Sequence, residues 1–164
     1  MGKLSIRRYQ HIHNLLVNEA FKQIEVIKFK NVKNFLKADS EIELQQLPKL
    51  LNQTLLPISL YDDDLCAGIC CLHDIDWENR NTKVKFIFDE KYNDLSKKNY
   101  INEYIKLICN FITSHFYIIK IDGVVIDNNE IIDKIIDDNF FVQNHIKGNG
   151  VIYVTRFLKK SESI

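Results

Sequence analysis

A long amphipathic helix between two apolar strands is the feature that most constrains how this chain can fold. Its apolar residues recur at helical spacing between residues 96 and 116, and they are Tyr100, Ile101, Tyr104, Ile105, Ile108, Phe111 and Ile112. Ser96 is placed to cap the first turn. The flanking runs 82–88 and 118–126 are rich in Val, Ile and Phe and predict strands. A strand, a helix and a strand in this order predict a crossover that joins parallel strands.

The rest of the chain predicts shorter elements joined by turns. The other predicted strands are 4–9, 57–61, 65–73, 142–145 and 151–158. The other predicted helices are 11–21, 40–51 (capped by Ser40) and 129–138, while 24–36 fits either a helix or a strand. Residues 62–64 and 147–150 predict hairpin turns, and 74–81 predicts a loop. We expect an α/β (α+β mixed) fold with a mixed, mostly antiparallel central sheet of about six to seven strands and helices on both faces.

The composition indicates a globular protein with no electrostatic preference for a polyanion. Hydrophobic residues make up 46% of the chain and charged residues 27%, and 22 basic residues balance 22 acidic ones. No apolar run approaches the roughly 18 residues that a membrane span needs, and residues 1–10 do not resemble a signal peptide. We therefore predict a single domain over 1–164, cytoplasmic, monomeric or homodimeric, with neither nucleic acid nor a membrane as partner.

The four cysteines predict no metal site. Cys66, Cys70 and Cys71 fall in one apolar run, and Cys109 lies on the amphipathic helix. A zinc site would need two pairs of ligands at turn-like spacing, and the sequence has no such second pair. We expect four small buried side chains in a reducing compartment.

Four stretches between residue 57 and the C-terminus carry a family resemblance. They are Leu65–Ile69 with its mid-strand glycine, His73–Arg80, Phe86–Tyr92, and Asn128–Glu130 followed by Asn139–Phe141. Together with the order of the elements, they resemble the GNAT acetyltransferase superfamily, and the local sequence is similar to its RimJ/RimL-like branch. The resemblance implies a GNAT-like acyltransferase domain.

The same resemblance implies acetyl-CoA as the acyl donor. In the family, the two crossover strands splay apart, and the pantetheine arm lies between them, bonded to the main chain that corresponds to Phe86, Ile87 and Phe88. The pyrophosphate sits on a glycine-rich turn at the start of the long helix, where free N–H groups and the helix dipole attract anions. The matching turn here, 92–99, has no glycine and contains Asp94. The other cofactor-binding residues that the resemblance implies are Leu95, Ser96, Lys97, Lys98 and Asn129.

Amide formation from a thioester needs a base that frees the acceptor amine of its proton. The family places the loop 74–81 beside the acyl group, which implies Glu78 or Asp76 as the catalytic base. His73 precedes these carboxylates and could pair with them as a proton shuttle.

The leaving thiolate needs a proton donor, which in this family is often a tyrosine on the short helix. The short helix of this chain has no tyrosine, and Tyr153 and Tyr117 are the alternatives. We predict an N-acetyltransferase that moves an acetyl group from acetyl-CoA to a primary amine by direct transfer, without a metal. The amine could be an amino sugar, a protein N-terminus or another small amine. Two alternatives stay open: a non-catalytic binding or scaffold protein with this fold, and an acyltransferase whose donor is an acyl carrier protein.

Overall fold

The computed structural model describes residues 2–8, 14–23, 25–31, 55–126, 129–146 and 150–159. They form β1 (Leu4–Arg8), α1 (Asn14–Lys22), β2 (Ile27–Lys30), β3 (Leu56–Asp62), β4 (Leu65–Asp76), β5 (Asn81–Asp89), α2 (Lys98–Phe116), β6 (Lys120–Ile126), α3 (Glu130–Asn139), β7 (Phe141–Ile146) and β8 (Val151–Phe157). Two short 3₁₀ turns, η3 (Glu90–Tyr92) and η4 (Leu95–Lys97), precede α2. The helix predicted at 40–51 lies outside the described residues.

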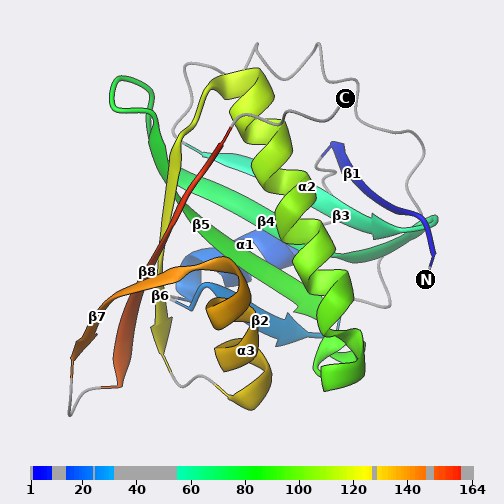
Figure 1. The fold of residues 1–164 in the computed structure, drawn as a ribbon. Helices are drawn as coiled ribbons and strands as arrows, with labels where there is room; N and C mark the ends of the chain where they lie inside the picture. The colour runs from blue at the N-terminus through cyan, green and yellow to red at the C-terminus, as the bar shows by residue number, and fades with distance from the viewer. Residues whose placement is uncertain are drawn as a thin grey trace.

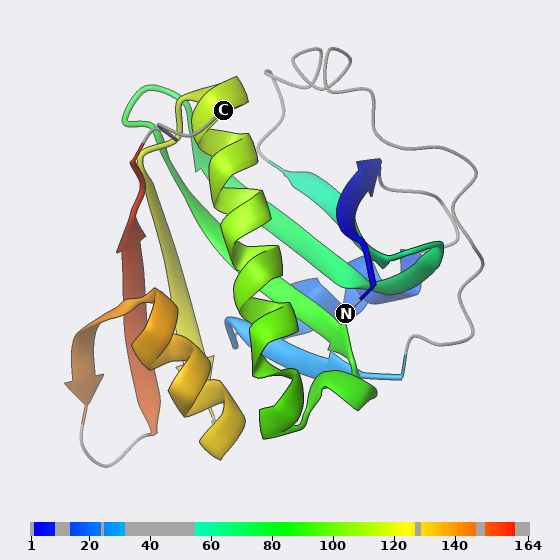
Figure 2. The ribbon, with the colours of Figure 1, turned by 45° about the vertical axis from the view of Figure 1, so that its right-hand side comes forward.

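A mixed sheet forms the middle layer, with α2 and α3 on one face and α1 on the other (Figure 1 and Figure 2). The strand order is β1-β3-β4-β5-β6-β8-β7, and β2 pairs with β5 off this path. The β2–β5 and β5–β6 pairs are parallel, and the other pairs are antiparallel. The predicted α/β class, mixed sheet and helix placement are confirmed. The predicted strand number was too low, because the described residues form eight strands. The additional one is β2, from the segment that fitted either a helix or a strand.

Side-chain alternation along the sheet separates two apolar layers. Val84, Phe86 and Phe88 of β5 belong to the main core beneath α2, whereas Ile87 and Cys71 belong to a smaller cluster with residues of α1. This is the alternation that the sequence predicts for β5. All four cysteines are buried and free, as predicted. No helix in the described part of the chain is long and apolar enough to cross a membrane.

The start of α2 differs from the prediction. Ser96 does not cap it, because the chain first tightens into η4, and α2 begins at Lys98. The carboxylate of Asp94 instead accepts the Ser96 N–H at 2.9 Å and caps η4. Asp94 therefore has a local structural role at the turn.

The hairpin between β4 and β5 is longer than predicted. β4 continues through Asp74 to Asp76 and β5 begins at Asn81, so the predicted loop 74–81 shrinks to 77–80. The pairing register shifts between His73 and Asp76, and Asp74 adopts a left-handed φ of 49°. Asp tolerates this conformation better than most residues, and such irregularities change the direction in which a strand presents its side chains.

Gly68 lies in β4 where the backbone of β5 comes close, and a Cβ there would overlap the Ile87 carbonyl oxygen. We therefore expect Gly68→Ala to lower the free energy of unfolding by about 2 kcal/mol, measured by urea denaturation, because the two strands must move apart. Gly150→Ala is the matched control, since a Cβ there meets nothing within 4 Å and only the positive φ of 67° is strained. A smaller loss at Gly68 than at Gly150 would contradict this account.

Candidate functional site

β5 and β6 pair over only three residues and then diverge. Asn81, Thr82 and Lys83 are in register with residues 120–122, and beyond this point β6 continues to pair only with β8. Figure 1 shows the two strands separating toward their carboxyl ends. The predicted splayed pair of strands is confirmed.

The short strand β2 lies between the diverging strands (Figure 1 and Figure 2). Residues 27–30 pair in parallel with 86–89, and the Phe86 N–H donates to the Val26 carbonyl oxygen at 2.6 Å. Val26 and Ile27 are completely buried, and the Val26 side chain packs against Gly123 of β6. The family resemblance implies that pantetheine binds the edge of β5 at Phe86, Ile87 and Phe88. This edge is paired with the chain's own β2.

The lysines of the predicted pyrophosphate turn have partners within the protein. The Lys98 ammonium lies 3.0 Å from the Asp138 carboxylate of α3. The Lys97 ammonium lies 5.2 Å from the centre of the Tyr100 ring. An anion at this turn would compete with these contacts, while the neighbouring Leu95 and Ser96 are exposed.

Asn129 caps α3, because its side-chain oxygen accepts the Ile132 N–H at 2.9 Å. It also borders a cavity of about 160 Å³ whose lining includes Asn93 beside the predicted pyrophosphate turn and Lys28 of β2. The structure thus brings the predicted residue Asn129 near the start of α2, with β2 lining the same space.

A second cavity of about 160 Å³ lies where β5 and β6 begin to part. Its lining residues are His73, Lys83, Val84, Lys85, Gly123 and Val124. The Lys85 ammonium reaches 3.5 Å from the Phe21 carbonyl oxygen in α1, so this cavity, which we call the vertex cavity, opens on the α1 face of the sheet. It combines three nitrogen-bearing side chains with the splayed strands, and it is the strongest candidate for an active site among the described residues.

His73 and Asp74 form a hydrogen-bonded pair at this cavity. The His73 Nδ1 lies 3.3 Å from Asp74 Oδ2, and the Lys83 ammonium lies 3.5 Å from the same oxygen. Burial and the positive charge of Lys85 lower the pKa of His73 below its ordinary value, although Asp74 opposes this shift. The imidazole is therefore neutral at pH 7. When Nδ1 donates to Asp74, Nε2 remains free to accept a proton, as a general base must.

The two carboxylates that the sequence favours as the base do not line the vertex cavity. Asp76 accepts the Asn79 N–H at 3.0 Å and the Asn79 side-chain amide at 2.8 Å, and these bonds lower the pKa of Asp76. A lowered pKa makes a carboxylate a weaker base at neutral pH. Glu78 is exposed in the connection 77–80. The assignment of Asp76 or Glu78 stays a prediction, and His73 is the residue that the geometry adds to it.

Of the two tyrosines considered as proton donors, Tyr153 is nearer the vertex cavity. It is the cross-strand partner of Val124 and therefore lies on the same face of the sheet, where it is 40% exposed. Tyr117 ends α2 in a left-handed conformation and is 65% exposed. Trp77 packs its ring edge-on against Phe116, with centroids 5.7 Å apart, and so closes the end of the core.

Lys83 and Lys85 are charged lining residues that the sequence did not mark as site residues. Side chains alternate along a strand, so a strand over 82–88 places Lys83 and Lys85 on one face with Ile87. What was missing was the position of His73 across the β4–β5 pair, where His73 is in register with Lys83.

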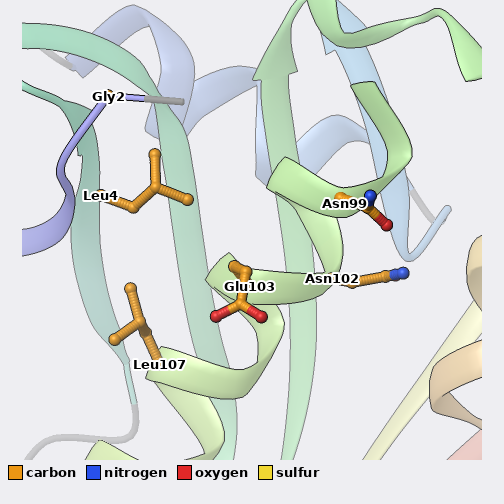
Figure 3. A pocket seen from close by; sticks show the side chains of 6 residues that line it. All are labelled: Gly2, Leu4, Asn99, Asn102, Glu103 and Leu107. Carbon is orange, nitrogen blue, oxygen red and sulfur yellow. The ribbon is translucent and has the colours of Figure 1, made fainter. Parts of the chain in front are cut away.

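A larger depression of about 620 Å³ lies between β1 and the start of α2. Figure 3 shows Leu4 and Leu107 on one side of it and Asn102 turned away toward the other. The Asn102 side chain bonds to Asn139 at 2.7 Å and to Asp138 at 3.4 Å. Glu103 is then the one titratable side chain among its described lining residues, so this depression lacks the convergent polar groups of the vertex cavity.

The fold matches those of solved spermidine N-acetyltransferases from Vibrio cholerae. One, in complex with CoA and spermine, is 15% identical with a TM-score of 0.64 and covers 96% of each chain. A chimera of the Vibrio cholerae enzyme SpeG and hSSAT is 14% identical with a TM-score of 0.64, covering 95% of this chain and 96% of that one. A dodecameric form is 13% identical with a TM-score of 0.62, covering 94% and 93%. No protein-family model and no curated protein sequence matches the chain. The predicted GNAT fold is thereby confirmed.

Proposed function

We propose that this chain is an N-acyltransferase that moves an acetyl group from acetyl-CoA to a primary amine bound in the vertex cavity. The observation that carries the proposal is the His73–Asp74 pair beside the point where β5 and β6 part. The acetyltransferase fold of the neighbours supports it, because the resemblance implies an acyl donor between these two strands.

In the proposed reaction, Nε2 of His73 accepts a proton from the acceptor ammonium, and Asp74 stabilises the imidazolium that forms. The freed amine nitrogen attacks the thioester carbonyl carbon, and the new C–N bond forms as the C–S bond breaks. As the amide forms, the attacking nitrogen passes its second proton to water, and the departing thiolate takes up one proton, from Tyr153 or from water. The proton held by His73 then returns to solvent, so one proton is released for each amine acetylated. The products are an N-acetylated amine and CoA. No covalent enzyme intermediate is needed.

The donor site needs a conformational step. For the pantetheine arm to bond to the main chain of 86–88, β2 must first leave this edge of β5. The pyrophosphate must then bind a turn without glycine, where Lys97 and Lys98 supply the positive charge. Both requirements weaken the binding of acetyl-CoA. Part of its interaction free energy is used to displace β2 and to bind at a turn without glycine, and a preformed groove would not need this.

We therefore expect CoA to bind weakly and to lose affinity as salt rises, in calorimetric titrations at low and high ionic strength. Contacts from partly exposed lysines are worth about 1 kcal/mol or less each and are screened by salt. Lys97→Met should weaken binding at low salt, whereas Lys106→Met, an exposed position farther along α2, should not. Tight binding that ignores salt would contradict this description of the turn.

A second candidate is a non-catalytic binding protein with this fold. The observation that favours it is β2 itself, which pairs with the strand edge where a donor would bind. Complete absence of CoA binding at both ionic strengths, together with no acetyl transfer, would support this candidate. An acyl carrier protein as donor would also need no pyrophosphate turn, and transfer from an acetylated carrier protein without CoA binding would distinguish that case.

The acceptor is a small-molecule or peptide amine. Among the structural neighbours, one spermidine N-acetyltransferase is in complex with CoA and spermine, and another is dodecameric. For this chain, the monomer or homodimer and the cytoplasmic location remain our predictions.

A further inference from the structure

We infer that the vertex cavity selects an amine that also carries an anionic group, such as a phosphate or carboxylate, and disfavours polyamines. This inference rests on the proposed function, because it names the class of acceptor for the same site. Its basis is the set of charges that face the cavity.

Two lysines, Lys83 and Lys85, line the vertex cavity, and the Asp74 carboxylate lies 3.5 Å from the Lys83 ammonium. Asp74 is shared between Lys83 and His73. Among the described residues, Lys85 has no carboxylate within ion-pair distance, and its ammonium lies 3.5 Å from the Phe21 carbonyl oxygen. With His73 neutral, the described lining is therefore net positive.

The environment of Lys85 supports the same conclusion. Burial and the nearby charge of Lys83 lower the pKa of Lys85, whereas Cys71 and Asp74 oppose the shift. A bound anion would offset both the burial and the repulsion, because it would pair with the ammonium at short range. A second ammonium on the ligand would add to the repulsion instead.

The other strands that border the cavity contribute no further free charge. β6 contributes Gly123 and Val124, and the adjacent residue of β8 is Tyr153. The Asp122 carboxylate on the same face is engaged by the Thr155 hydroxyl at 2.6 Å and by the Lys120 ammonium at 3.6 Å. None of the described lining residues is therefore acidic, and the two nearby carboxylates, Asp74 and Asp122, already bond to side chains of the protein.

The spacing of the groups suits a short bifunctional ligand. His73 is in register with Lys83, and Cys71 with Lys85, so His73 and Lys85 are diagonal neighbours on the same face of adjacent strands. Diagonal neighbours in a sheet lie about 7–8 Å apart, within the reach of a long side chain such as lysine. An amine at His73 and an anion at Lys85 can thus belong to one small molecule, consistent with a cavity of about 160 Å³.

The test compares phosphoethanolamine with ethanolamine, which have the same amine and differ by the phosphate, and with spermidine. With acetyl-CoA as donor, we expect kcat/KM for phosphoethanolamine to exceed that for ethanolamine by about tenfold, the size of one added charged hydrogen bond. Spermidine should be the poorest of the three. Lys85→Met should remove most of the phosphoethanolamine preference, Lys85→Arg should retain it, and Lys106→Met, a matched loss of charge on the exposed side of α2, should leave the ratio unchanged.

Direct titration of the two amines by NMR, without any donor, separates this inference from the proposed function. Tighter binding of phosphoethanolamine, lost in Lys85→Met, supports the inference even if no acetyl transfer occurs, in which case the proposed function fails alone. The inference is overturned if the two amines bind equally or if spermidine is the preferred acceptor. If acetyl transfer occurs in that case, the proposed function still stands.

Discussion

His73→Gln should lower the rate of acetyl transfer by about 10²- to 10⁴-fold, because it removes the proposed general base while keeping a polar side chain of similar size. The effect should fall on kcat, with CoA affinity unchanged, since His73 lies at the vertex cavity and not at the turn that is predicted to bind the pyrophosphate. Steady-state kinetics and calorimetric titration of CoA measure the two quantities separately.

The pH dependence provides an independent readout of this base. Burial and Lys85 lower the pKa of His73 below its ordinary value of about 6.5. As the pH rises through this lowered pKa, the imidazole loses its proton and becomes active as a base. We expect a rising limb of kcat in that region, and its loss in His73→Gln. Asp74→Asn should retain part of the rate, because Asp74 orients His73 and does not accept the substrate proton.

Asp76→Asn and Glu78→Gln are the comparison variants, since the sequence favours these two carboxylates as the base. The Asp76 carboxylate holds the turn at Asn79, and Glu78 is exposed, so we expect at most a small change in rate from either. A loss of 10² or more in one of them, with His73→Gln active, would return the base to this turn.

Ile27→Asp should raise CoA affinity by about 10²-fold, because a charge in this fully buried position expels β2 from the edge of β5. The free energy now used to dock β2 would then no longer oppose donor binding. Calorimetric titration measures the affinity, and hydrogen exchange of the Phe86 amide reports the release, since its present acceptor is the Val26 carbonyl oxygen.

Ile27→Val is the matched control, because it keeps β2 apolar and should leave both CoA affinity and exchange near their original values. Ile27→Ser is a milder variant for the case in which the aspartate unfolds the domain, which circular dichroism would detect. Released β2 with unchanged CoA affinity would show that β2 and the donor do not compete for this edge.

The sequence by itself determined the architecture, because its signals are local. The periodicity of α2 and the alternation of β5 place apolar side chains on defined faces, and those faces settle which side of the sheet each residue joins. The burial of the four thiols follows from the same local chemistry, while the mid-strand Gly68 was noted through the family resemblance. The splay of the crossover strands was predicted through the family resemblance and is confirmed by the three-residue pairing of β5 with β6.

Only the tertiary structure decided which segment lies between the diverging strands β5 and β6 and which side chains lie beside them. Residues 27–30 are about as compatible with a helix as with a strand, and their pairing with 86–89 joins segments far apart in the chain, which no local pattern specifies. The same holds for the proposed catalytic base, His73. The bond between His73 and Asp74 depends on a register shift and a left-handed φ at Asp74, while Lys83 and Lys85 reach the cavity from the neighbouring strand. Non-local pairing sets the position of these groups, because it depends on how the strands meet and not on the residues of any one strand alone.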